Sequence, residues 1–350
     1  MRLSCSLGSL LSINEILSCA KTLSETDVDA IWVPETWGME SFAMLGAVSA
    51  AAPLPRIGSS IVNVYSRSPA AIAMGAATVD TLSGGRLLLG IGASSPAIVE
   101  GLHGVRYESP LKRVRETVEI VRLATSGRRV DYEGELFSLN GFRLLVRPVQ
   151  DGIPVYLAAV NRGMVRLAWD VGDGVIFYLR PLDEMRRTIR AMHKESGRRI
   201  DVACQLITCV SDDDGGEAAV ERARRTIAFY VAVGDVYRNF LSANGFGDEA
   251  ASIYGEYRSS GLAGVHRYVS DGMLDALAVC GTPKSCKKRL GAFRDAGLDL
   301  PILQFNPVGD VAGSFALFAE TFFGYDGAGS TKHDGDGSRG AAAGGGGGMP

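Results

Sequence analysis

The 350-residue sequence contains few of the residues that usually carry metal or redox chemistry. It has four histidines and six cysteines, and no two cysteines stand at C-x-x-C spacing. No uninterrupted apolar run reaches the roughly 18 residues that a transmembrane helix needs. Charge is nearly balanced, with 36 basic and 39 acidic residues and no basic stripe. We therefore expect a cytoplasmic protein with reduced thiols that acts on a small molecule and binds no metal, nucleic acid or membrane.

The two ends of the chain differ in composition. Met1 leads directly into an alternating apolar segment without the charged and then apolar leader of a signal peptide, so we expect none. Residues 324–350 are mostly Gly, Ala, Ser and Asp and can bury little apolar surface. We expect residues 1–323 to fold as one domain and residues 324–350 to form a disordered Gly-rich tail.

Between the ends, short β-rich runs alternate with helical patterns. Several of the runs, such as LLLGIG, are almost entirely apolar, which is typical of parallel strands covered on both faces. Eight strands alternating with helices predict an α/β fold, a (β/α)8 TIM barrel, and a doubly wound open sheet is the alternative. The candidate strands cover residues 2–7, 29–34, 56–62, 86–92, 153–158, 174–178, 201–210 and 300–306, and the helices cover 13–24, 42–51, 69–82, 111–126, 160–169 and 182–195.

Two connections are longer than a plain strand–helix unit needs. The first, at about 93–150, contains a helix and a possible hairpin in DYEGELFSLNGFRL. The second, at about 211–298, has a helical pattern throughout. Long insertions in a barrel usually build or cover its site, so we expect both to contribute to function.

Catalytic groups of a barrel lie where its strands end and the following loops begin. These positions contain one carboxylate, Glu35, and no histidine. The histidines fall elsewhere, and only His103 and His266, in the two insertions, could reach a ligand. Small residues dominate the strand ends instead, with Gly90, Gly92 and Ala158 among them. They leave room for a flat, bulky ligand or, alternatively, serve close packing of strands on helices.

Three side chains near the second and third strands each have two possible roles. Arg67 precedes the helix start Ser68-Pro69, a position that suits an anion, or it pairs with a carboxylate for structure. Glu35 is an acid–base candidate, or it holds a helix N-terminus. Trp37 stacks on a substrate or cofactor ring, or it is a core aromatic.

The run VNVYSRSPAAIAMGAATVDTLSGGRLLLGIG resembles the luciferase-like superfamily of flavin and deazaflavin oxidoreductases, and IPVYLAAVNRGMVRLAWDVGDGVIF, IAFYVAVG and DALAVCGTP follow in the same order. Within the superfamily, the sequence most resembles the F420-dependent methylenetetrahydromethanopterin reductases, over roughly residues 1–324. The resemblance implies a (β/α)8 barrel with helical insertions that binds coenzyme F420 in its mouth. It also implies hydride transfer to or from a small substrate, and a homodimer formed by helices of the barrel's early half, such as FAMLGAVSAAAPL.

The resemblance also assigns residues to the cofactor. It implies a non-prolyl cis peptide at Ser60–Ile61, in a bulge that backs the cofactor ring. Residues at the ends of the third, fourth and fifth strands would line the cofactor, together with one residue of the seventh. These are Ser59, Ser60, Ile61, Asn63, Gly90, Ile91, Gly92, Ala158, Ala159, Val160, Asn161 and Thr208.

Two departures from the family pattern concern proton transfer. The reductases carry a functional glutamate near the end of the first strand, where this sequence has Ser6. F420 enzymes commonly have Asp-His after the second strand, where this sequence has Glu35 and Thr36. Ser6, Glu35 and Thr36 are thus the catalytic candidates, and Trp37 and Arg67 are candidates for contacting substrate or phosphate.

The departures leave three hypotheses open. The first is an F420-dependent oxidoreductase with an unidentified, possibly pterin-like substrate. The second is an FMN-dependent luciferase-like monooxygenase. The third is a barrel that binds a flavin or deazaflavin without catalysis.

Overall fold

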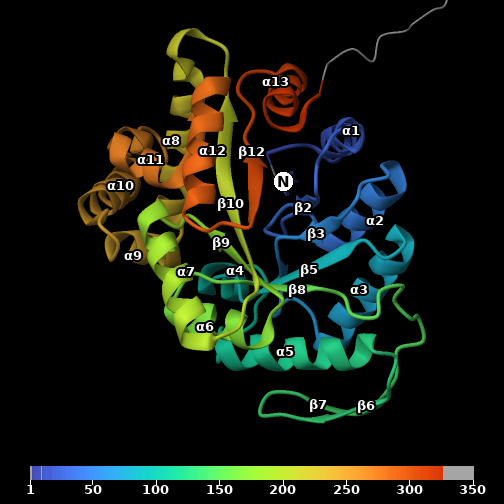
Figure 1. Ribbon diagram of the computed structural model, residues 1–350. Helices are drawn as coiled ribbons and strands as arrows, with labels where there is room; N and C mark the ends of the chain where they lie inside the picture. The colour runs from blue at the N-terminus through green and yellow to red at the C-terminus, as the bar shows by residue number, and fades with distance from the viewer. Residues whose placement is uncertain (1, 9, 326–350) are drawn as a thin grey trace, which may run out of the picture.

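A closed barrel of eight parallel strands forms the centre of the computed structural model, which describes residues 2–8 and 10–325 (Figure 1). Strand β12 pairs with both β10 and β1 and so closes the barrel. The third position is divided between two short strands, β3 and β4, which both pair with β5. The predicted (β/α)8 barrel is confirmed. Its strands are β1 (Ser4–Ser6), β2 (Ile31–Val33), β3 (Ile57–Ser59) with β4 (Val62–Asn63), β5 (Leu87–Gly92), β8 (Val155–Ala158), β9 (Gly174–Tyr178), β10 (Asp201–Val210) and β12 (Leu300–Phe305).

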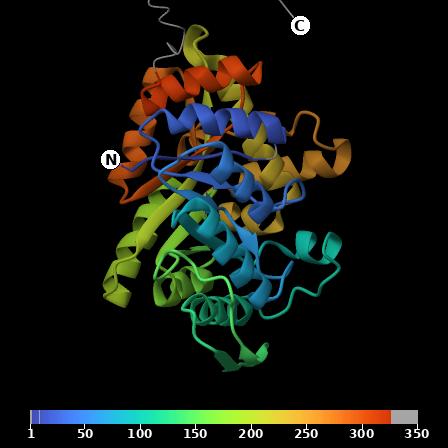
Figure 2. The same cartoon turned by 90° about the vertical axis from the view of Figure 1, so that its right-hand side faces the viewer.

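Helices follow the strands and cover the outside of the barrel. The six that were predicted all form, with ends within two residues of the expected positions. Capping residues explain where two of them start. The side chain of Ser68, which precedes Pro69, accepts a hydrogen bond from the Ala71 amide, and the side chain of Asn161 accepts one from the Met164 amide. The outer helices are α1 (Ile13–Ser24), α2 (Ser41–Ala51), α3 (Pro69–Ser83), α5 (Pro110–Thr125), α6 (Arg162–Val171), α7 (Leu182–Ser196), α12 (Pro283–Asp295) and α13 (Val311–Phe323). Figure 2 shows α13 lying beside α1, where the barrel closes.

Two aromatic rings fill the interior of the barrel. Trp32 and Tyr156 meet edge to face with their ring centroids 5.4 Å apart. The neighbouring strands carry glycine at these points, because a Cβ on Gly58 would lie 2.6 Å from the Trp32 ring and one on Gly174 would lie 2.3 Å from Tyr156. The Tyr156 hydroxyl donates to Asp201 across 2.6 Å, which fixes its ring. The interior is therefore a packed floor, and space for a ligand opens only above it.

The two insertions add distinct structures. The first holds α4 (Pro96–Gly101) and the predicted hairpin, which is confirmed as antiparallel β6 (Val130–Glu133) and β7 (Ser138–Phe142). The second holds α8 (Glu217–Val233), α9 (Asp235–Ser242), α10 (Gly247–Ser260) and α11 (Asp271–Leu277), which pack around an apolar cluster of their own and stand on the left in Figure 1.

The expectation that the second insertion is helical throughout was wrong at its end. Residues Ala278–Gly281 form strand β11, which pairs in parallel with residues 207–210 of β10. Strand β10 has ten residues, and β9 pairs only with residues 201–205 along one of its edges. Without β11, the backbone groups of residues 207–210 on that edge would have no strand to pair with. Most of the predicted tail, residues 326–350, lies outside the described residues. Within the described part of the chain, none of the helices has the length and apolar character needed to cross a bilayer.

The packed floor gives a stability prediction. The substitution Gly174→Ala brings a methyl group into contact with the Tyr156 ring, which its hydrogen bond to Asp201 holds in place. We therefore expect the free energy of unfolding to fall by about 2 kcal/mol or more. The matched control is Gly291→Ala in α12, where a Cβ meets nothing within 4 Å. Helix propensity there predicts a gain of up to about 1 kcal/mol. Equal thermal midpoints for the two variants would contradict the packed floor.

Candidate functional site

The third barrel position contains a bulge at the C-terminal end of its strands. The Ser60–Ile61 peptide is cis, as the resemblance implied. Because Gly58 pairs with Leu88 and Val62 pairs with Ile91, the three residues 59–61 lie opposite the two residues 89–90. The Ser59 hydroxyl replaces the missing ladder bonds: it donates to the Gly90 carbonyl and accepts from the Gly90 amide, both at 2.9 Å. The bulge is thus built into the sheet by hydrogen bonds.

The small residues around the bulge have a packing role. A Cβ on Gly90 would lie 1.9 Å from the Ser59 carbonyl oxygen, so the backbone itself requires glycine there. A Cβ on Gly92 would lie 2.8 Å from Cδ1 of Ile61 and 3.1 Å from Cβ of Ala158. Close packing, one of the two roles considered from the sequence, therefore accounts for both glycines. Ile61 lies across this gap and remains partly exposed.

Two polar atoms at the bulge are buried without a partner among the described residues. They are the Ser60 hydroxyl and the Asn63 side-chain nitrogen. The other end of the Asn63 amide, Oδ1, accepts a hydrogen bond from the Tyr65 amide at 2.9 Å, which leaves the NH₂ group to donate elsewhere. Buried polar groups are almost always hydrogen-bonded. These two atoms are therefore suited to the carbonyl or ring nitrogen atoms of a bound heterocycle.

Other residues assigned to the cofactor by the resemblance do not direct their side chains to the mouth. Ile91 and Ala159 are buried in the outer core between strands and helices. The buried Thr208 hydroxyl donates to the Leu206 carbonyl at 2.9 Å. Val160 and Asn161 line a second cavity of about 510 Å³ at the start of α6. Of these residues, only Val160 and Asn161 line a cavity, at the N-terminus of α6.

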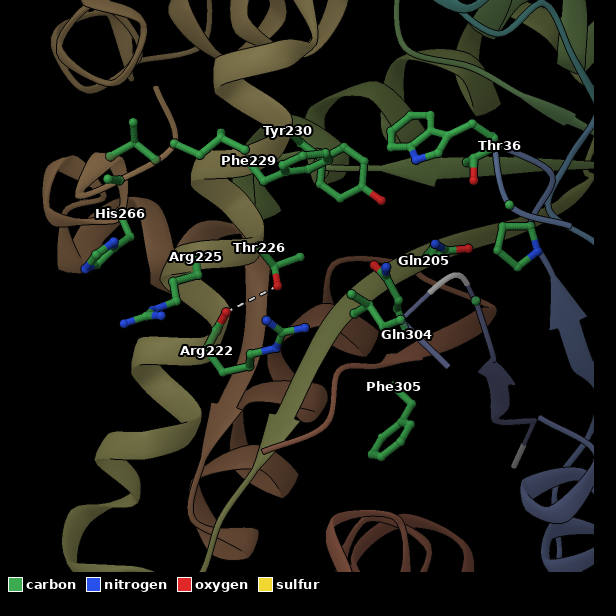
Figure 3. A pocket seen from close by; sticks show the side chains of 18 of the residues that line it. Thr36, Gln205, Arg222, Arg225, Thr226, Phe229, Tyr230, His266, Gln304 and Phe305 are labelled. Carbon is green, nitrogen blue, oxygen red and sulfur yellow. Dashed lines mark hydrogen bonds between the residues drawn. The ribbon is translucent and has the colours of Figure 1, made fainter. Parts of the chain in front are cut away.

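A cavity of about 680 Å³ lies at the C-terminal ends of the strands, under the second insertion (Figure 3). Of the predicted site residues, only Thr36 and Trp37 line it. The Trp37 ring is 56% exposed and its centroid lies 6.2 Å from that of Phe229, so the alternative of a core aromatic is wrong. The remaining lining includes residues of the strands and their following loops, one face of α8 and a residue of the segment after α10. These are Gly8, Pro34, Gln205, Gln304, Phe305, Arg222, Arg225, Thr226, Phe229, Tyr230 and His266.

The α8 residues were missed in the sequence analysis, although the motif IAFYVAVG that contains two of them was noted there. Their signal is a helical spacing of polar and aromatic residues, Arg222, Thr226 and Phe229 with Tyr230, on one face of the helix. His266, in the same insertion, does line the cavity. It lies 3.1 Å from the Glu221 carboxylate.

Glu35 and Arg67 form a bidentate ion pair beside the cavity. Arg67 donates to both carboxylate oxygens of Glu35, at 2.7 and 2.8 Å, and it also pairs with Glu40. Glu35 further accepts the Ser41 amide at 3.1 Å, at the start of α2. The side chains of Glu35 and Arg67 are 7% and 18% exposed, and neither lines the cavity. This geometry matches the structural role considered for each residue, with both carboxylate oxygens engaged by donors.

Ser6 lies inside the barrel, in register with Trp32 and Gln304. It is fully buried, and its hydroxyl has no partner among the described residues. Gln304, beside it on β12, does line the cavity. The Tyr178 hydroxyl donates to the Gln304 side-chain oxygen at 2.9 Å, and burial raises the Tyr178 pKa, so this hydroxyl keeps its proton at neutral pH. The Gln304 amide is thereby held with its NH₂ group free to donate.

The permanent charges of the main cavity have one sign. Its lining contains Arg222 and Arg225, together with His266, and no aspartate or glutamate. Within residues 2–8 and 10–325, no group of three or more His, Cys, Asp or Glu side chains is placed to hold a metal ion. The site can therefore orient an uncharged or anionic molecule by hydrogen bonds and aromatic contacts, with no carboxylate in its wall to transfer protons.

Comparison with known proteins relates the chain to a luciferase-like family and to proteins described as F420-dependent. The sequence model of a family described as luciferase-like monooxygenase matches residues 2–300. The chain is similar to the 5,10-methylenetetrahydromethanopterin reductase of Archaeoglobus fulgidus, with 29% identity over 297 residues, covering 83% of this chain and 88% of the relative. It is similar to a putative coenzyme F420-dependent oxidoreductase of Mycobacterium tuberculosis, with 27% identity over 304 residues, covering 79% and 86%.

The fold also matches solved structures. The coenzyme F420-dependent tetrahydromethanopterin reductase from Methanopyrus kandleri superposes with a TM-score of 0.81 at 20% sequence identity. The match covers 91% of this chain and 97% of that one. At this identity the likeness establishes a shared fold, the (β/α)8 barrel.

The Glu35–Arg67 pair gives a prediction that separates a structural from a catalytic role. Glu35→Gln leaves a guanidinium without its main partner, so we expect a loss of about 2 kcal/mol in unfolding free energy. Glu40→Gln is the control, because Glu40 is 46% exposed and its pairing is worth less than about 1 kcal/mol. Urea unfolding measures both. If Glu35→Gln unfolds like the unmodified protein, the structural role is refuted.

Proposed function

The chain belongs to the luciferase-like monooxygenase family, and on that premise we propose that it is an F420-dependent oxidoreductase. It would transfer a hydride between coenzyme F420 and a small organic substrate held in the main cavity. One observation carries the proposal: the bulge at 59–61 leaves the Ser60 hydroxyl and the Asn63 NH₂ group buried and unpaired at the mouth of the barrel. Relatives described as F420-dependent support this cofactor, and the FMN alternative is not needed to account for them.

The residues at the bulge fit a flat deazaflavin ring. Ser60 and Asn63 would bond to its polar edge, and the partly exposed Ile61 side chain would support its face. Gly92 and Ala158 give Ile61 the room to lie flat. When bound, coenzyme F420 supplies the ring carbon that gives or receives the hydride.

The chain's own residues would then position the substrate and exclude water. Trp37, Phe229 and Tyr230 form an aromatic wall of the cavity, and Gln304 offers an oriented donor. Hydride transfer depends mainly on the distance and alignment of the two carbons, so a wall without carboxylates is compatible with it. Thr36 is the one sequence-predicted catalytic residue that lines the cavity, and we assign it a hydrogen bond to the substrate. Glu35 acts as a positioning residue that holds the loop carrying Thr36 and Trp37.

We also propose that the protein is a homodimer through the face formed by α2 and α3. Two large apolar side chains of α3 are exposed there, Met74 at 54% and Leu82 at 61%. Leu82 lies over Gly46 of α2, 3.8 Å from where a Cβ would stand. Exposed apolar side chains grouped across two helices are typical of a protein interface.

The cofactor proposal predicts binding of F420 rather than FMN. Titration of the purified chain should change the fluorescence of F420, with weaker or no binding of FMN. Gly92→Ala pushes Ile61 toward the ring position, so we expect its F420 affinity to fall about tenfold, which corresponds to about 1.4 kcal/mol. Gly291→Ala serves again as the control, with unchanged affinity. Binding of FMN alone would refute the proposal.

The dimer proposal predicts a change of mass. Leu82→Glu places a charge in the α2–α3 face, so the protein should run as a monomer in light scattering, while the unmodified chain runs as a dimer. Lys288→Gln on α12, away from this face, lowers the net charge by the same one unit and should leave the dimer intact. A monomeric unmodified chain would refute the proposal.

A further inference from the structure

Arg222 is a cation without a partner in the wall of the main cavity. Its guanidinium makes no hydrogen bond or ion pair with any residue that the structure describes, and its Nε atom is buried. The next arginines of α8 differ from it. Arg224 pairs with Asp271, and Arg225 pairs with Glu221 at 2.9 Å. Arg222 is thus the arginine of this group whose charge no described residue neutralises.

The orientation of Arg222 directs this charge inward. Figure 3 shows its guanidinium pointing from α8 toward Gln304 and Gln205, while Arg225 and His266 lie on the other side of the helix. Arginine stays charged at every physiological pH. Removing its guanidinium group from water is unfavourable unless another group pairs with it. An anion in the cavity would provide that pairing.

The surroundings of Arg222 favour an anion over a neutral ligand. The cavity lining contains no aspartate or glutamate that could compete for the guanidinium. The Tyr178 hydroxyl occupies the oxygen of the Gln304 amide at 2.9 Å, so the NH₂ group remains to donate. A guanidinium fork and an amide donor facing the same space form a typical site for a carboxylate or phosphate group.

The rest of the cavity has a different character. The rings of Trp37 and Phe229 lie 6.2 Å apart, centroid to centroid, in the same cavity wall. Figure 3 shows Phe229 and Tyr230 on one side of the cavity and Arg222 with Gln304 on the other. A ligand that spans both sides needs an anionic end and a planar apolar body.

We propose that the substrate of this enzyme is a small organic oxyanion, a carboxylate or a phosphate ester, whose charged end binds Arg222 and Gln304. Its planar body packs against Trp37 and Phe229. The identity of this ligand as the hydride partner rests on the proposed F420-dependent function. The anion site itself rests only on Arg222 and its surroundings.

The test compares charged and neutral probes of one shape. Trp37 is the exposed tryptophan of the chain, since Trp32 and Trp169 are buried, so quenching of tryptophan fluorescence reports on the cavity. Benzoate should bind at least about tenfold more tightly than its neutral counterpart benzamide. Phenyl phosphate, measured alongside, shows which of the two anionic groups fits better. Equal affinities of benzoate and benzamide, or no binding of either anion, would overturn the proposal.

Variants then assign the preference to Arg222. Arg222→Gln should abolish the benzoate preference, and Arg222→Lys, which keeps the charge but loses the fork, should retain part of it. Arg224→Gln, on the same helix but outside the cavity lining and paired with Asp271, is the matched control and should retain it fully. Thermal midpoints close to that of the unmodified chain establish that each variant is folded. A benzoate preference that survives in folded Arg222→Gln overturns the proposal.

F420 titration separates this proposal from the one on which it rests. Arg222→Gln should bind F420 as the unmodified chain does. If it loses F420 affinity, Arg222 serves the cofactor and the substrate proposal is wrong, while the F420-dependent function stands. If the unmodified chain fails to bind F420 but its benzoate preference depends on Arg222, the anion site stands and the F420-dependent function is wrong.

Discussion

The ion pair between Glu35 and Arg67 holds the mouth of the barrel together. It joins the loop after β2 to the loop after β4, and Glu35 also fixes the start of α2 through the Ser41 amide. Both groups are largely buried, so the pair resists screening by salt more than a surface pair does. Thr36 and Trp37 follow Glu35 directly and line the main cavity. Their position depends on this pair.

The barrel and the second insertion form different sides of the site. The barrel supplies a rigid side: the packed floor of Trp32 and Tyr156, and the bulge tied to β5 by the Ser59 hydroxyl. The second insertion supplies the other side through α8, with Arg222 and Phe229. In the proposed function, the first side serves the cofactor and the second recognises the substrate. With the two tasks on separate elements, substitutions in α8 can change which substrates bind while the structure of the barrel stays the same.

The structure explains how the site can be built without the expected proton-transfer residues. In the sequence, Ser6 and Thr36 stand where the resemblance implies a glutamate and a histidine, and Glu35 was a candidate acid or base. In the fold, Ser6 is buried below the cavity and Glu35 is bound to Arg67. What the cavity offers is a set of donors, among them Arg222 and Gln304. A site built from donors can bind an oxyanion and orient it for hydride transfer.

The sequence by itself determined the elements and the fold class, because these follow from local patterns. Apolar strand runs and capping residues such as Ser68 and Asn161 act over a few residues. The bulge at Ser60–Ile61 was expected only from the resemblance to a known family. Only the tertiary structure decided the wall of the site. Arg222 and Thr36 are far apart in the chain, and which side chains share a cavity depends on how α8 packs over the strand ends. The roles of Gly90 and Arg67 were equally undecided, because a steric contact with Ser59 or a partner carboxylate exists only after long-range packing.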